Sequence, residues 1–168
     1  GEENPGGKLP ISIPRSAGQI PVFYNHKPSG NRSNIYGDYV NEKVSPLYPF
    51  GHGLSYSTFE YEDLIIDKRE IMAGEVVNIS CKVSNTSKIA GEEVVQLYCR
   101  DIFASIPRPV KELKGFNKIA LLAGETKSIT FKLPIDMLAF YDIDLNLVTE
   151  HFSCGIILRV IIFADDPG

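Results

Sequence analysis

Short alternations of apolar and polar residues run through the later part of the chain. They lie at residues 58–67, 75–85, 92–101, 112–122 and 127–133, and turn signals such as Ala73-Gly74-Glu75 and Ala123-Gly124-Glu125 separate them. Short strands at this spacing, without a long helical pattern, are typical of an antiparallel β-sandwich. We therefore predict a mainly β chain in which residues 59–168 form such a sandwich.

The first 45 residues have a different pattern. Pro and Gly interrupt the sequence repeatedly, and residues 30–41 are polar and prone to turns. The apolar run at residues 20–24 is interpreted as a strand, and residues 9–13 offer a second candidate. This stretch has too little periodic apolar sequence for a core of its own. We therefore expect residues 1–45 to form an irregular arm that lies against another body.

Residues 46–58 form a strap between the arm and the sandwich. Their sequence mixes aromatic side chains with two Pro and two Gly, so it cannot continue as a regular helix or strand. The strap is nevertheless too apolar for an idle solvated loop. We expect it to pack between two bodies, and the candidates for interdomain packing are Tyr48, Phe50, His52, Tyr56 and Phe59.

Charge and hydropathy exclude some partners. The formal net charge of -4 and the pI of about 5.4 argue against a nucleic-acid backbone as a partner. The longest apolar stretch, residues 155–164, is interrupted by Arg159 and is too short to span a bilayer, so we expect no membrane partner. Residues 1–7 are polar and do not resemble a signal peptide. The compartment stays open between a bacterial cytoplasm and a periplasmic or secreted location.

Cysteine and asparagine positions carry little chemistry. Cys81, Cys99 and Cys154 are odd in number and lack C-x-x-C spacing, so we predict buried free thiols rather than a disulfide framework. The segments starting at Asn78 and Asn85 match the glycosylation acceptor pattern, which matters only in a secretory pathway.

No residue set indicates a cofactor, a metal or a catalytic group. Residues 142–146 have the start of an EF-hand spacing, but Leu147 and Ser153 replace its Gly and its bidentate Glu, so a hairpin turn is favoured. Glu60 and Glu62 fall on one face of a predicted strand and are interpreted as solvated. We therefore predict no catalytic residue, no cofactor and no metal in this chain.

Several ordered segments resemble one enzyme family. They are Asn4-Pro5-Gly6-Gly7-Lys8-Leu9-Pro10, the run from Tyr24 to Gly30, the strap, the run from Gly91 to Tyr98, and the run from Pro107 to Phe116. Over residues 4–150 the chain resembles the C-terminal region of glycoside hydrolase family 3 enzymes, of the β-glucosidase or β-xylosidase type. The resemblance implies that residues 1–45 end an α/β sandwich domain and that residues 59–168 form a fibronectin type III-like domain. The tail after residue 150 departs from the family pattern.

The resemblance also implies a function. Family members are retaining β-glycosidases, and the regions that supply their catalytic carboxylates are not among these residues. We therefore expect a non-catalytic piece of a β-glucosidase that braces upstream catalytic domains of the same polypeptide. Tyr24 and His26 are weaker candidates for the rim of the sugar pocket.

An accessory module for carbohydrate or cell surfaces is the alternative. In that case Tyr36, Tyr39, Tyr48 and Tyr56 would have to replace the missing Trp in contacts with an oligosaccharide. Self-association by strand addition also stays open.

Overall fold

A computed structural model describes residues 1–27, 43–68, 71–101 and 104–149. The strands are β1 (Phe59–Ile66), β2 (Val76–Asn85), β3 (Gly91–Cys99), β4 (Glu112–Leu121), β5 (Thr126–Pro134), β6 (Phe140–Tyr141) and β7 (Leu147–Val148). Two 3-10 helices, η1 (Ala17–Gln19) and η2 (Ile135–Leu138), complete the described elements. The predicted alternations therefore became strands β1 to β5, with boundaries within two residues of the apolar pattern.

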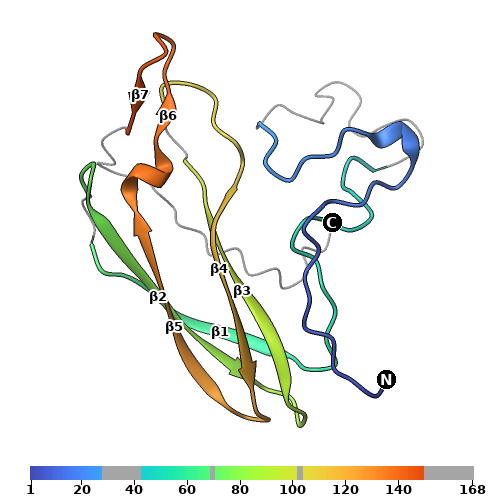
Figure 1. The fold of residues 1–168 in the computed structure, drawn as a ribbon. Helices are drawn as coiled ribbons and strands as arrows, with labels where there is room; N and C mark the ends of the chain where they lie inside the picture. The colour runs from blue at the N-terminus through green and yellow to red at the C-terminus, as the bar shows by residue number, and fades with distance from the viewer. Residues whose placement is uncertain (28–42, 69–70, 102–103, 150–168) are drawn as a thin grey trace.

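Strands β1 to β5 form two facing sheets. One has the order β1-β2-β5 and the other pairs β3 with β4, all antiparallel (Figure 1). This arrangement confirms the predicted fibronectin type III-like β-sandwich. The prediction of a strand at residues 20–24 is wrong, because the structure has no strand there. At residues 9–13 only Ile13 forms a bridge, to Tyr48.

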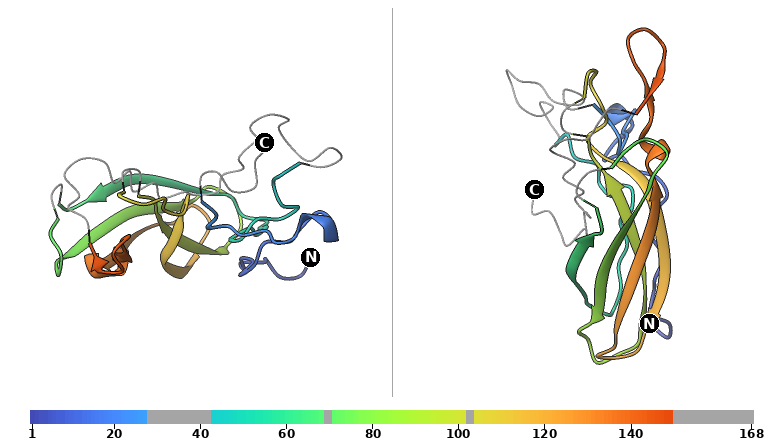
Figure 2. Two further views of the ribbon diagram at one scale, coloured as in Figure 1. Left: turned by 90° about the horizontal axis from the view of Figure 1, so that it is seen from above. Right: turned by 90° about the vertical axis from the view of Figure 1, so that its left-hand side faces the viewer.

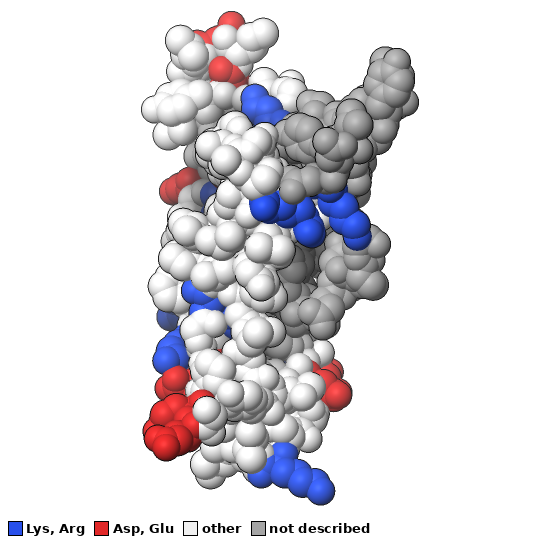
Figure 3. Space-filling view, turned by 90° about the vertical axis from the view of Figure 1, so that its right-hand side faces the viewer, with Lys and Arg blue, Asp and Glu red and all other residues white. Residues whose placement is uncertain are grey.

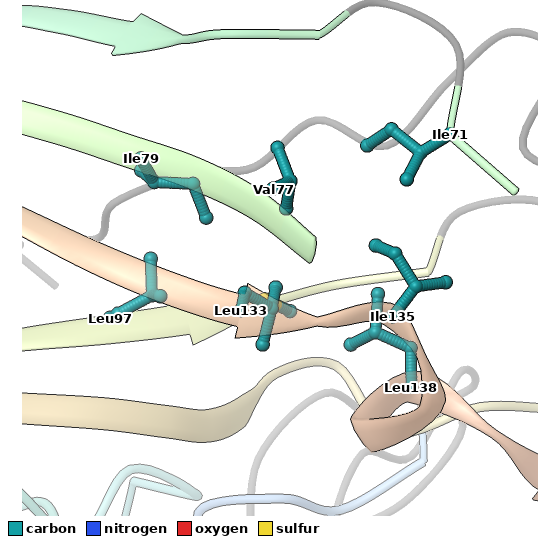
Figure 4. Packing of buried hydrophobic residues seen from close by; sticks show 8 residues of the cluster. Ile71, Val77, Ile79, Leu97, Leu133, Ile135 and Leu138 are labelled. Atoms are coloured by element: carbon teal, nitrogen blue, oxygen red, sulfur yellow. The ribbon is translucent and has the colours of Figure 1, made fainter. Parts of the chain in front are cut away.

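The core lies between the two sheets in two adjacent clusters. Strand β2 supplies both, because its buried residues fall at every second position and so share one face. The first cluster combines Ile71, Val77, Ile79, Leu97, Cys99, Leu133, Ile135 and Leu138, and Figure 4 shows its labelled members gathered from both sheets, from η2 and from the loop before β2. The second combines Cys81, Val83, Val95, Leu121 and Ile129.

Both described cysteines are free and buried, as predicted. Cys81 belongs to the second core cluster and Cys99 to the first. Burial raises the pKa of Cys81, and it raises that of Cys99 to about 12. Cys99 is therefore a protonated, inert thiol at neutral pH. Cys154 lies outside the described residues.

The first strand is an interrupted edge strand. Its pairing with β2 shifts register between Glu62 and Ile65, and Asp63 has a φ of 51°. Bulges of this kind protect an exposed sheet edge from pairing with another chain. Glu60 and Glu62 are both exposed here, which agrees with their interpretation as solvated residues.

A small hairpin of β6 and β7 follows η2 and projects from the sandwich in Figure 1. Its turn is organised by Asp142, whose Oδ1 accepts hydrogen bonds from the backbone N–H groups of Asp144 and Asn146, both at 2.9 Å. The hairpin turn predicted at residues 142–146 is confirmed. The described part of the chain contains no cluster of residues able to hold a metal ion.

Asn85 ends β2 and is almost completely buried. Its amide nitrogen donates to the backbone carbonyls of Ile89, Leu121 and Leu122, and its amide oxygen accepts from Ser87. One side chain therefore ties together the β2–β3 and β4–β5 turns at this end of the sandwich.

Figures 1 and 2 show from different directions that the arm and the strap run along one flank of the sandwich. Within the described ranges no helix is long and apolar enough to cross a membrane. The arm, which we expected to lie against another body, therefore lies against the sandwich of the same chain.

Candidate functional site: the arm, the strap and their seam with the sandwich

Backbone hydrogen bonds join the arm to the strap. Leu9 N–H donates to the His52 carbonyl and Gly51 N–H donates to the Leu9 carbonyl, both at 2.8 Å. Ile13 and Tyr48 exchange N–H···O bonds in the same way, at 2.8 and 3.3 Å. Two irregular segments, each too short for a core, therefore satisfy part of each other's backbone.

Asn4 in the arm forms hydrogen bonds with the C-terminal end of the strap. Its amide nitrogen donates to Ser57 Oγ at 2.7 Å and to the Ala90 carbonyl at 2.9 Å. Its amide oxygen accepts from Ser55 Oγ at 3.0 Å and from Tyr56 N–H at 2.9 Å. Arm, strap and the turn before β3 therefore meet at a single amide side chain.

A buried charge links the arm to the sandwich. Glu93 on β3 is 7% exposed, and its carboxylate lies 3.1 Å from Lys8 Nζ in the arm. The same carboxylate accepts a 2.9 Å hydrogen bond from the Tyr61 hydroxyl on β1. Burial, followed by the charge of Glu93, raises the pKa of Tyr61 far above its ordinary range. Tyr61 is therefore a permanent donor to Glu93, and Lys8 balances the charge.

An aromatic cluster connects the same three parts further along. The rings of Tyr24 in the arm and Phe50 in the strap stack with centroids 4.2 Å apart. Both meet the buried ring of Tyr98 on β3 edge-on, at 6.1 and 6.5 Å. Leu113 N–H donates to the Tyr24 hydroxyl at 3.3 Å. These geometries are favourable for aromatic pairs and add to the area that the rings bury.

Close backbone approach requires glycine at this seam. Gly51 has a φ of +83°, and a Cβ there would lie 2.5 Å from Gln96 Oε1 and 2.7 Å from the Tyr98 hydroxyl. At Gly91 a Cβ would lie 2.5 Å from Ser57 Oγ. The strap therefore contacts β3 without room for an added methyl group.

The remaining candidates lie at different depths. Tyr48 is 44% exposed and stacks on the half-buried His52 ring at 5.1 Å, and Tyr56 is 60% exposed. Phe59 is half-buried against the second core cluster. His26 is half-buried, and its backbone carbonyl accepts from Val110 N–H. The roles in interdomain packing and at a pocket rim stay predictions. Tyr36, Tyr39 and the divergent tail lie outside the described residues.

Sequence reasoning missed the polar side chains of this seam. Asn4 and its partners are more than fifty residues apart in sequence, and Lys8 and Glu93 still further. No local pattern reveals such pairs. The only available signal was the Pro- and Gly-rich arm itself, which indicated a segment in need of support.

The arm and the strap carry seven large apolar side chains that are exposed. They are Ile11, Ile20, Phe23, Leu47, Tyr48, Leu54 and Tyr56, of which Leu54 is 74% exposed. Figure 3 views the molecule from this flank, where most of the described surface is neither acidic nor basic. Exposed apolar side chains that gather into one patch are typical of an interaction site. We call these seven residues the docking face.

Comparison with known proteins identifies the parts of the chain. A family model of a fibronectin type III-like domain matches residues 93–157, in agreement with the sandwich. The model of the glycosyl hydrolase family 3 C-terminal domain matches residues 1–56, which cover the arm and most of the strap.

Relatives match the chain across both parts. A periplasmic beta-glucosidase of Salmonella typhimurium is 46% identical over 95% of this chain and 22% of its own length. A beta-xylosidase of Formosa agariphila is 45% identical over 99% of this chain and 23% of its own. The crystal structure of a beta-glucosidase from Listeria innocua in complex with glucose superposes with a TM-score of 0.80, at 44% identity over 88% of this chain and 21% of that one.

The fold and the family matches together define a fibronectin type III-like sandwich that follows a segment of the glycosyl hydrolase family 3 C-terminal domain. The chain belongs to glycoside hydrolase family 3 and corresponds to the C-terminal region of its members. It spans less than a quarter of the length of the relatives named above.

Proposed function

We propose that this chain is the non-catalytic C-terminal region of a retaining β-glycosidase, most consistently a β-glucosidase, and that it braces the upstream catalytic domains. The names of the relatives support a β-glucosidase or β-xylosidase activity for the longer protein. The proposed partners are the catalytic domains of the same polypeptide, which the docking face would contact.

The docking face is the observation that carries this proposal. Its apolar side chains are exposed although the backbone behind them is fixed to the sandwich by Asn4, by the Lys8–Glu93 pair and by the Tyr24–Phe50 stack. Exposing apolar area on a rigid segment is unfavourable unless a partner covers it. A face that is both preformed and uncovered is suited to a permanent neighbour.

The surroundings of Glu60, Glu62 and Glu93 are consistent with a bracing role. Retaining chemistry needs two carboxyl groups about 5–5.5 Å apart across the sugar, one of them with a raised pKa. Glu93 is occupied by Lys8 and Tyr61, whereas Glu60 and Glu62 are exposed to water on an edge strand. None of the three is in the environment that such chemistry requires.

The first test is hydrolysis of aryl β-glucosides, β-xylosides and N-acetyl-β-glucosaminides by the purified 168-residue chain. We expect a cooperatively folded protein without turnover above the blank. Turnover that a point mutation in this chain abolishes would contradict the proposal.

The second test addresses bracing in the longer enzyme. Leu54→Asn replaces an apolar group on the docking face, and Ile143→Asn is the matched control because Ile143 is 87% exposed on the β6–β7 hairpin. We expect Leu54→Asn to lower the melting temperature of the catalytic domains and Ile143→Asn to leave it unchanged. Equal melting temperatures for both variants and the wild type would rule out docking through Leu54.

A further inference from the structure

Gln19 is a buried amide at the end of η1, only 3% exposed. Its Oε1 accepts a 2.7 Å hydrogen bond from Arg15 N–H. Its Nε2 lies 3.1 Å from the Lys43 carbonyl oxygen and 3.0 Å from those of Val44 and Ser45. Three consecutive carbonyls of the chain that leads into the strap thus converge on one side-chain nitrogen.

This environment fixes the orientation of the Gln19 amide. An NH₂ group has two hydrogens, so two carbonyls are bonded directly and the third shares a hydrogen. The reverse orientation would place Oε1 against three carbonyl oxygens and Nε2 against a donor. An apolar side chain at position 19 would remove the donor to the Lys43 and Val44 carbonyls and one of the donors to the Ser45 carbonyl.

Arg15 extends the same set of contacts. Its Nε donates to the Ser45 carbonyl at 2.9 Å, and its Nη2 lies 3.5 Å from the Pro46 carbonyl. Two side chains of the arm therefore account for four successive carbonyls, from residue 43 to residue 46. We call this arrangement the carbonyl clamp.

The part of the docking face that the strap supplies begins directly after the clamp. Leu47 N–H and Tyr48 N–H both donate to the Ile13 carbonyl, at 2.9 and 3.3 Å. With the preceding carbonyls turned toward Gln19, the Leu47 and Tyr48 side chains are 46% and 44% exposed. The path of the chain at residues 43–46 therefore determines how these two apolar groups are presented.

We propose that Gln19 is a positioning residue for interdomain docking: it holds residues 43–45 so that Leu47 and Tyr48 are preformed for contact with the catalytic domains. This inference rests on the proposed bracing function. It adds a named residue that touches no partner itself and acts by fixing residues 43–45, which lead into the strap.

Hydrogen exchange of the 168-residue chain tests the positioning role. Gln19→Met keeps the volume and removes the donors, and Asn4→Ala is the matched control because Asn4 holds Tyr56 N–H at the other end of the strap. Loss of a hydrogen bond is worth about 1 kcal/mol, so we expect the Leu47 and Tyr48 amides to exchange at least about fivefold faster in Gln19→Met. Asn4→Ala should accelerate Tyr56 instead, and neither variant should change β2 amides such as Ile79.

Two results would overturn the proposal. One is unchanged exchange at Leu47 and Tyr48, and the other is equal acceleration of these amides and of Ile79, since that indicates global destabilisation. If Gln19→Met does not fold, Arg15→Met provides the same test, because Arg15 is exposed and holds Ser45 and Pro46. It should accelerate the same two amides by a smaller factor.

The melting temperature of the longer enzyme separates this proposal from the bracing function. Lowered values for both Gln19→Met and Leu54→Asn support both. A lowered value for Leu54→Asn alone overturns the positioning role and leaves bracing intact. Unchanged values for both variants, with exchange accelerated at Leu47 and Tyr48, overturn docking and the role of Gln19 in it together.

Discussion

Gly51 offers the sharpest test of the contact between strap and sandwich. Gly51→Ala would place a methyl group 2.5 Å from Gln96 Oε1 and 2.7 Å from the Tyr98 hydroxyl, at a φ of +83°. Gly124, with a φ of +73° and no atom within 4 Å of the added Cβ, provides a matched control. Both substitutions carry the backbone penalty and the same gain from a less flexible unfolded chain, but only Gly51→Ala carries a steric one.

The magnitudes follow from these contacts. The left-handed conformation costs an L-residue about 1–2 kcal/mol, which is the most that Gly124→Ala should lose, because the less flexible unfolded chain offsets part of it. In Gly51→Ala the methyl group must also displace the hydrogen bond from the buried Tyr98 hydroxyl to Gln96, which costs about 1–3 kcal/mol more. We therefore expect Gly51→Ala to lower the free energy of unfolding by about 1–5 kcal/mol.

Urea unfolding of the two variants and the wild type measures both losses in the free energy of unfolding, provided that the three proteins have equal slopes of this free energy against urea concentration. The informative quantity is the difference between the variants, which removes the shared backbone penalty. A difference below about 0.5 kcal/mol would refute the reasoning, since it would mean that the strap moves away from β3 without cost.

Three further predictions concern neighbouring groups. Phe50→Ala removes a half-buried ring stacked on Tyr24 and should lower the free energy of unfolding of the chain by about 2–4 kcal/mol; an unchanged melting temperature would count against the stack. Cys99, with its pKa raised to about 12, should resist iodoacetamide at neutral pH until urea unfolds the chain, and peptide mass spectrometry would detect early labelling. Hydrogen bonds from Asn78 lower the pKa of Asp67, so the stability that this carboxylate contributes is present above its unfolded pKa and lost as the pH falls through the lower folded value. Asp67→Asn should flatten the acid limb of a stability–pH curve, and an identical limb would contradict this assignment.

The sandwich was predictable because its strands are locally encoded. In β2 the buried Val77, Ile79, Cys81 and Val83 alternate with polar or exposed neighbours, so the period alone indicates both the strand and its inner face. Turn residues mark where each strand stops. Such signals need no knowledge of the partner strand.

The arm was predictable only in outline. The apolar run at 20–24 has the composition of a strand but does not form one, because Pro21 lacks a backbone donor and Ile20 and Phe23 are exposed. Its apolar character therefore cannot be assigned to the core of this sandwich. Asn4 and Gln19 resembled ordinary loop residues, since their partners are set by tertiary structure.

Asn85 has a consequence for producing the protein. Asn85-Thr86-Ser87 is an acceptor sequence for N-linked glycans, yet the folded chain leaves its amide no room and no free hydrogen-bonding capacity. A eukaryotic secretory host attaches glycans while the chain is still emerging, before β2 and β4 can enclose this side chain. A sugar placed there would prevent the two turns from closing, so the yield of folded protein from such a host would fall with the occupancy of this one site. Asn85→Asp would remove the acceptor sequence but would not restore the yield of folded protein, because a carboxylate has no donor for the Leu121 and Leu122 carbonyls. Ser87→Ala, which removes the acceptor sequence and keeps the amide, is the substitution that the structure tolerates better.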